Sequence, residues 1–117
     1  MVNTSRITFI IILCLFLGTL SAFAIDIESL ANSIYKAEGG KNTKFPYGVK
    51  SVKCEGEKEC RQICVNSIKN NLARWKTAGN PGSFIKFMAS RYIPKSVDPA
   101  GHDAWIKNVT YFYERNL

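Results

Sequence analysis

The first 24 residues constrain the fold most, because they have the pattern of a leader peptide and not of a globular domain. Arg6 precedes an almost unbroken apolar run over residues 7–17, and the tripeptide AFA follows at 22–24. This order of charged, apolar and small residues is typical of a secretory signal peptide. The run is shorter than the roughly 20 residues of a membrane-spanning helix. We therefore predict a signal peptide at 1–24, with an uncleaved N-terminal anchor as the alternative.

Such a signal peptide would direct the protein to the periplasm or the cell exterior. Its cleavage would leave one small domain. Removing 24 of the 117 residues leaves 93, which is enough for a single modest core. Fifteen Lys and Arg and nine Asp and Glu residues remain, so the net charge is +6. A basic exported protein meets anionic partners such as wall polymers or lipid headgroups. A solvated basic surface without a specific partner explains the charge equally well.

Three cysteines, Cys54, Cys60 and Cys64, remain in the mature chain. In an oxidising compartment an odd number leaves one thiol unpaired. The segment CEGEKEC closes a short loop, so we predict a Cys54–Cys60 disulfide, with Cys64 as a buried free thiol on a helix. A Cys₃His zinc site with His102 is the alternative, but the C-x5-C-x3-C spacing fits structural zinc poorly. We expect no metal and no cofactor.

The mature chain contains four segments with helical periodicity. The first covers 26–38 and the second 57–78. Each of the other two is expected to begin at a cap residue followed by proline, NP at 80–81 and DP at 98–99. The third should end before Pro94. The many aromatic residues of the last two helices are expected to lie in the core.

An irregular segment separates the first two helical patterns. Residues 41–56 contain Pro46, Gly48 and Gly56, and "YGVKSVKC" alternates between apolar and polar positions. This pattern indicates a short β-hairpin or an extended loop. We therefore predict a mainly α domain over 25–117, with about four helices and this hairpin or loop after the first. In fold-class terms it would be an α+β arrangement in which helices dominate.

Glu38 stands where the first helical pattern stops before two glycines. It follows Ile34 by four residues and Ala31 by seven, so it shares the apolar face of that helix. Partial burial and the negative end of the helix dipole both favour the protonated form of a carboxyl group. A glycosidase general acid needs such a group. In the alternative, the carboxylate is solvated or pairs with a nearby lysine: Lys36, Lys41 or Lys44.

Several segments resemble one protein family. "IYKAEGG" followed by "PYGVKS" resembles the catalytic-Glu segment of the lysozyme-like superfamily, and specifically of small lytic transglycosylase-like proteins. "ARWKTAGNPGSFIKFMASRYIP" and "AWIKNVTYFY" are similar to the later helices of those proteins. The resemblance covers most of residues 27–113. The family's usual "GLMQ" and "AYNAG" motifs are absent.

The resemblance implies a lysozyme-like fold and a role for each matching residue. Glu38 would act first as general acid and then as base. One carboxylate suffices if the N-acetyl group of the sugar is the internal nucleophile. The implied substrate-binding residues are those that would line the two walls of a cleft: Tyr47, Gly48 and Ser51 beside Glu38, with Tyr92 and Tyr111 opposite.

The sequence therefore predicts an exported, monomeric enzyme that cleaves the glycan strand of peptidoglycan. Its partner would be that polymer. We expect no nucleic acid, because the basic residues are not gathered into one stripe. We also expect no membrane span after signal cleavage. The main alternative is a non-catalytic wall-binding or accessory domain with the same fold, which the two absent motifs favour. A small secreted toxin-like or inhibitor protein is a third reading.

Overall fold

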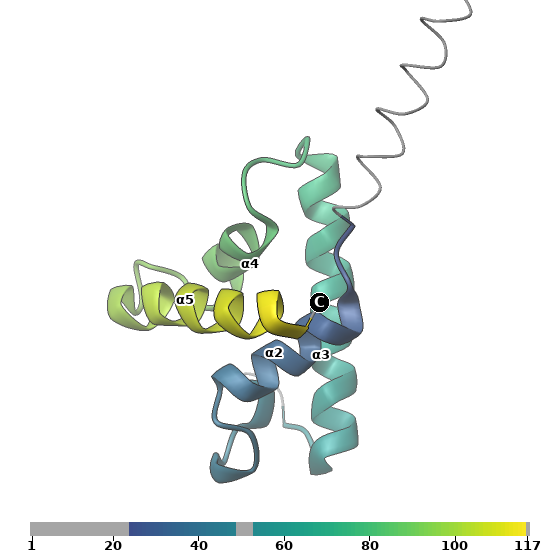
Figure 1. The fold of residues 1–117 in the computed structure, drawn as a ribbon, viewed down its shortest axis with the longest axis vertical. Coiled ribbons are helices and arrows are strands. Elements are labelled where there is room, and N and C mark those ends of the chain that lie inside the picture. Colours follow the sequence, from purple (N-terminus) through teal and green to yellow (C-terminus); the bar gives the residue numbers. More distant parts are fainter. Residues whose placement is uncertain (1–23, 49–52, 117) are drawn as a thin grey trace, which may run out of the picture.

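The computed structural model describes residues 24–48 and 53–116, which form four α-helices and two short 3₁₀ helices (Figure 1). In chain order the elements are α2 (Ile27–Ala37), η1 (Gly40–Asn42), η2 (Pro46–Gly48), α3 (Gly56–Thr77), α4 (Phe84–Tyr92) and α5 (Pro99–Asn116). No helix within these described ranges is both long and apolar enough to cross a membrane. The prediction of a mainly α domain with about four helices is confirmed.

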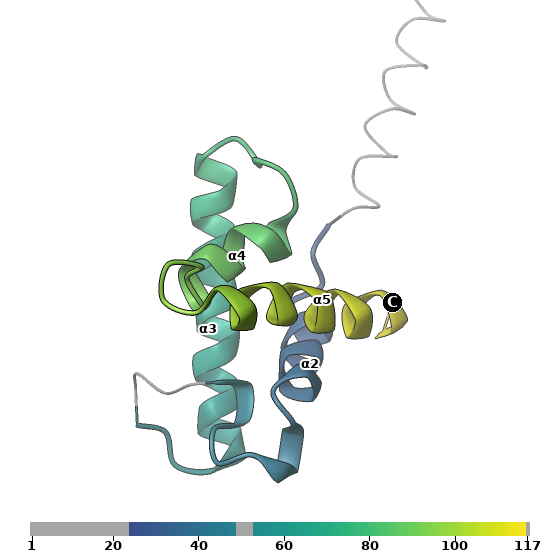
Figure 2. The ribbon, with the colours of Figure 1, turned by 90° about the vertical axis from the view of Figure 1, so that its left-hand side faces the viewer.

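The long helix α3 forms one side of the domain, and α5 crosses the other side (Figures 1 and 2). Helices α2 and α4 each contact both α3 and α5, so they lie between them. The η2 turn contacts α2 and α3 at one end of this arrangement. The end of α2 and the following loop are therefore brought against α3, although that helix starts 18 positions after Glu38.

The core is built from the apolar faces of all four helices. Burying these side chains is the main favourable contribution to folding. The fully buried or nearly buried residues include Leu30, Ala31 and Ile34 from α2, Cys64 and Ile68 from α3, Phe84, Met88 and Ala89 from α4, Trp105, Val109 and Tyr113 from α5, and Tyr47 from η2. Phe84, Trp105 and Tyr113 confirm that aromatic residues of the last two helices serve the core.

Helix α2 begins and ends as the sequence predicts. Asp26 is its N-cap, and its carboxylate accepts a hydrogen bond from the Ser29 N–H at 3.0 Å. Glu38 is its C-cap. Gly39 follows with a φ of 98°, a left-handed conformation that commonly ends helices. Asp98 caps α5 in the same way as Asp26, by accepting from the Gly101 N–H at 2.9 Å.

Helix α4 begins later than the Asn-Pro pair at 80–81 predicts. Its N-cap is Ser83, whose hydroxyl oxygen accepts from the Lys86 N–H at 3.5 Å. Asn80 instead has a φ of 55°, and its N–H donates to the Trp75 carbonyl oxygen at 2.9 Å. That bond closes the C-terminus of α3. The predicted N-cap was therefore wrong, because Asn80 completes the preceding helix.

The loop after α2 contains two 3₁₀ turns in its described part. Neither 40–48 nor 53–55 contains a strand, so the hairpin alternative finds no support there. The centre of the alternating pattern, 49–52, lies outside the described residues. Beyond it, Cys54 and Cys60 form a disulfide, and Cys64 is a buried free thiol. Both cysteine predictions are confirmed.

Candidate functional site

Glu38 lies at the end of α2 with its carboxyl group against the backbone of Gly48. The side chain is half-buried. A Cβ atom added to Gly48 would lie 2.8 Å from both Cδ and Oε1 of Glu38, closer than real contacts allow. Gly48 also has a φ of 67°, which L side chains rarely adopt. Only glycine at this position allows the carboxyl group to approach the turn so closely.

Tyr47, the residue before that glycine, has the left-handed backbone at a φ of 64° and a side chain that is 1% exposed. Its ring packs on Tyr35, with 5.0 Å between the ring centroids. Its hydroxyl oxygen accepts from Nη1 of Arg61 at 3.2 Å. The enclosed ring presents no surface to a glycan. The structure therefore places the ring of Tyr47 in the interior, and not on an exposed cleft wall as the resemblance implies.

Tyr92 reaches the same turn from α4. Its hydroxyl donates a hydrogen bond to the carbonyl oxygen of Tyr47. Burial raises the pKa of Tyr92, and negative charge on Cys64 or Glu38 acts in the same direction. Its ring also packs on Trp105, with centroids 5.4 Å apart. Tyr92 and Glu38 therefore belong to one electrostatically linked site at the Tyr47–Gly48 turn.

Cys64 lies in the interior beside this site and is 0% exposed. Burial raises the pKa of its thiol to about 12, while Arg61 lowers it and Glu38 raises it. At neutral pH the group is a protonated thiol, which is neither a nucleophile nor a metal ligand. Across the described ranges, no three His, Cys, Asp or Glu side chains are grouped so that they could hold a metal ion.

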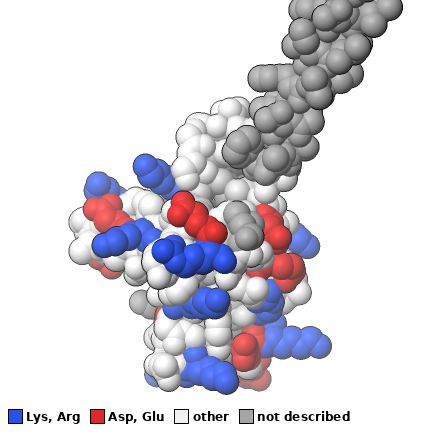
Figure 3. All heavy atoms as spheres, viewed as in Figure 1, with Lys and Arg blue, Asp and Glu red and all other residues white. Residues whose placement is uncertain are grey.

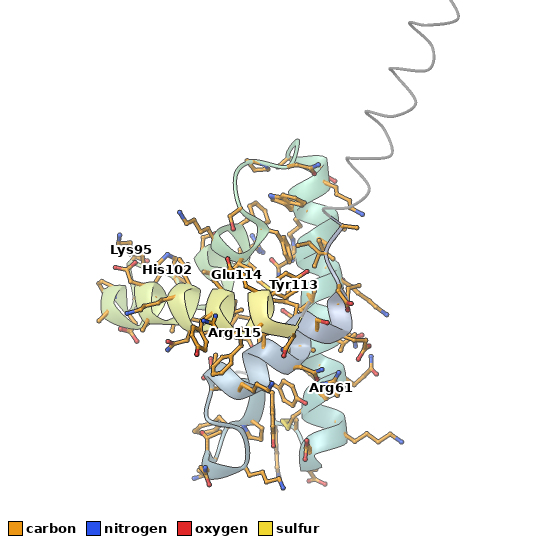
Figure 4. All side chains as sticks on the ribbon, in the orientation of Figure 1. Arg61, Lys95, His102, Tyr113, Glu114 and Arg115 are labelled. Carbon is orange, nitrogen blue, oxygen red and sulfur yellow. A yellow bond between two sulfur atoms is a disulfide. The ribbon has the colours of Figure 1, made fainter. Side chains whose placement is uncertain are left out.

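Tyr111, the remaining aromatic residue expected at the cleft, lies on the exposed side of α5. Its side chain is 49% exposed. Arg115, labelled in Figure 4, stacks over its ring with Cζ 3.5 Å from the centroid. Phe112 contacts the ring edge-on at 5.2 Å. The structure thus shows Tyr111 in contacts within its own helix. Ser51 lies outside the described residues.

Arg61 is the residue of this region that sequence reasoning missed. Figure 4 shows it on α3, near α2. Its Nη2 pairs with Oε2 of Glu28 at 2.6 Å, and its Nη1 donates to Oδ1 of Asn32 at 2.8 Å and to the Tyr47 hydroxyl. In the sequence it falls on the polar face of a helical pattern. All three partners lie 14 to 33 positions away, so no local spacing could identify them.

On the face seen in Figure 3, basic and acidic side chains are interspersed over the helices. Three ion pairs join described residues, and two of them, Lys53–Glu55 and Lys95–Asp103, are well exposed. Such pairs contribute little to stability. The third joins Glu28 to Arg61, and it belongs to the network that contacts Tyr47.

Four residues therefore make up the candidate site. Glu38, Tyr47, Gly48 and Tyr92 meet at the end of α2 from three different elements. Arg61 supports this group from α3. No protein-family model, curated protein or solved structure matches the chain significantly.

Proposed function

We propose that the chain is an exported enzyme that cleaves the glycan strand of peptidoglycan, with Glu38 as its single catalytic carboxyl group. The observation that carries this proposal is the contact between Glu38 and the Tyr47–Gly48 turn. Two consecutive residues of that turn have positive φ, and one of them is a tyrosine. Non-glycine residues in this conformation are costly and cluster at functional sites. A fold that keeps such a turn against a carboxyl group favours a chemical role for the group.

The environment of Glu38 suits a general acid. It stands at the C-terminal end of α2, where the partial negative charge of the backbone carbonyl groups disfavours a negatively charged side chain. Its carboxyl group would protonate the glycosidic oxygen of the leaving sugar and then accept a proton in the second step. With a single carboxylate, the N-acetyl group of the sugar would be the internal nucleophile. The substrate class is therefore an N-acetylated glycan.

Tyr92 and Gly48 would shape the position of the acid. The hydroxyl proton of Tyr92 is committed to the Tyr47 carbonyl oxygen, so Tyr92 would hold the turn and not act as a proton donor. Gly48 would leave room for the carboxyl group beside the turn. Cys64, protonated and fully buried, would take no part in the reaction.

The second candidate is a wall-binding or accessory domain without catalysis. One observation favours it: the ring of Tyr47 is enclosed, and Tyr111 contacts its own helix, so fewer aromatic surfaces meet at Glu38 than the family resemblance implies. Such a domain would still bind insoluble wall. The two functions make different predictions for the same variants.

The test compares wild type with Glu38→Gln on purified wall, with products identified by mass analysis. Gln preserves shape and hydrogen bonding but cannot donate the proton, so the cleavage rate should fall by at least about 10² with little change in melting temperature. Glu114→Gln, a change at an exposed residue of α5, is the matched control and should cleave normally. Anhydro-sugar ends would identify a lytic transglycosylase, and reducing ends a hydrolase.

Two results would contradict the proposed function. Equal cleavage by wild type and Glu38→Gln would exclude Glu38 from the chemistry. No cleavage by wild type across a range of pH, together with cosedimentation of the protein with wall, would establish the binding domain instead.

A further inference from the structure

The Tyr47–Gly48 turn has the least favourable backbone conformation near the candidate site, and side chains from three helices fix it. Tyr35 of α2 packs on the Tyr47 ring at 5.0 Å. Tyr92 of α4 binds the Tyr47 carbonyl oxygen. Arg61 of α3 binds the Tyr47 hydroxyl at 3.2 Å. A tyrosine keeps a left-handed conformation only when its surroundings determine its position from several sides.

Arg61 differs from the other two because its side chain hydrogen-bonds to more than one residue. Its guanidinium group also binds Asn32 at 2.8 Å and Glu28 at 2.6 Å, both on α2. A planar guanidinium with several partners has a defined orientation, which a lysine amine would not have. The Tyr47 hydroxyl raises the pKa of Arg61 more than any other neighbour does, with the Glu28 hydrogen bond next. The group is therefore a charged donor that joins α2 and α3 to the turn.

We propose that Arg61 is a positioning residue: it holds the Tyr47–Gly48 turn against the carboxyl group of Glu38. Releasing the Tyr47 hydroxyl would allow this tyrosine to leave the left-handed region. Gly48 follows directly in the chain, so its contact with Glu38 would then loosen. The structural part of this proposal stands without any activity. Its consequence for catalysis depends on the proposed function.

The hydrogen bond from the Gly48 N–H to the Phe45 carbonyl oxygen, 2.9 Å long, reports the state of the turn. Hydrogen exchange at this amide measures how often the turn opens. The amide of Ile68, in the buried part of α3, reports global unfolding. The ratio of the two exchange rates therefore separates local opening from loss of overall stability.

The first experiment measures both amides in wild type and in Arg61→Gln. We expect Gly48 to exchange about tenfold faster in the variant, the effect of losing one hydrogen bond to a charged group. Arg74→Gln, an exposed arginine on the same helix, is the control and should change neither amide. An unchanged Gly48 amide in Arg61→Gln would overturn the proposal. Equal acceleration of Gly48 and Ile68 would also overturn it.

A double-mutant cycle identifies the contact responsible. Tyr47→Phe keeps the packed ring and removes only the hydroxyl that Arg61 binds. It should accelerate Gly48 exchange about as much as Arg61→Gln, and the double variant should show little further change. Additive effects of the two substitutions would mean that Arg61 acts through another partner, and the proposal would fail.

Kinetics on wall glycan then test the catalytic consequence. Arg61→Gln should lower kcat by up to about 10², because small misplacement of a catalytic group is costly, with KM nearly unchanged. Arg61→Lys should recover only part of this loss. An active wild type with unchanged kcat in Arg61→Gln would overturn the positioning role. An inactive wild type with faster Gly48 exchange in the variant would reject the proposed function and support the structural part of this inference.

Discussion

Two arginine–tyrosine pairs in this domain differ in which parts of the chain they join. Arg61 binds the hydroxyl of Tyr47 across 14 positions and also contacts α2. Arg115 stacks over Tyr111 one helical turn away and donates to the carbonyl oxygen of that residue at 3.1 Å. The first pair joins separate elements, and the second joins neighbours that the helix already brings together. Only the first pair can determine where a loop lies.

Burial follows the same division. Tyr47 is 1% exposed, whereas Tyr111 is 49% exposed. The left-handed backbone of Tyr47 requires compensation from its contacts, while Tyr111 sits in the regular helix α5 and needs no such compensation. The sequence resemblance predicts both tyrosines as substrate-binding residues. Their difference shows that an aromatic residue of a candidate site can support the backbone instead of lining an exposed surface.

The largest expected effect comes from deleting each ring. Tyr47→Ala should lower the free energy of unfolding by about 3–5 kcal/mol, the range for a buried aromatic residue, whereas Tyr111→Ala should change it by about 0.5 kcal/mol or less. Urea unfolding of both variants measures the two values. Similar losses for the two variants would erase the distinction between a supporting and a surface tyrosine.

The second prediction uses the pKa of the Cys64 thiol to test how well the interior beside Tyr92 is shielded from water. An unfolded cysteine titrates near 9.0, and burial raises the pKa of Cys64 to about 12 in the folded protein. Between these values the folded state binds more protons, so stability is complete below pH 9 and falls as the pH rises toward 12. The raised pKa of Tyr92 acts in the same direction above pH 10.

We therefore expect the free energy of unfolding to fall by a few kcal/mol between pH 9 and 12. In the folded protein at pH 8, Cys64 should not react with a thiol reagent. Cys64→Ala should be less stable at neutral pH but should lose less stability between pH 9 and 12. Rapid labelling of native Cys64 at pH 8 would show that the region is open. An identical pH profile in Cys64→Ala would remove the thiol as the titrating group.

Much of the fold follows from local sequence signals. Asp26 and Glu38 mark the ends of α2 because capping and glycine termination depend on a few adjacent residues. The same holds for Asp98 at the start of α5. Spacing and the odd number of cysteines also identify the Cys54–Cys60 disulfide. These features need no knowledge of tertiary structure.

The remainder depends on contacts between distant positions. Asn80 carries a cap signature, but its N–H is used by the end of α3. The site shows the same limit: Glu38 can be selected from the buried face of one helix, whereas the enclosure of Tyr47 requires α2, α3 and α4 together. Arg61 has no local signal at all. Sequence thus identifies the candidate acid more readily than the residues that position it.

The smallest expected effect concerns Glu28, and it separates the two kinds of contact that Arg61 makes. The Glu28 side chain is 70% exposed, so its ion pair is screened by water and is worth about 0–1 kcal/mol. Glu28→Gln should lower stability by no more than this, and Gln can still accept a hydrogen bond from the guanidinium group. Arg61 would keep Asn32 and Tyr47, so the Gly48 amide should exchange at the wild-type rate. A Glu28→Gln variant as destabilised as Arg61→Gln, with equally fast Gly48 exchange, would mean that the exposed ion pair holds the arginine in place. The enclosed hydroxyl contact would then be a consequence of that pairing and not the reason the turn stays closed.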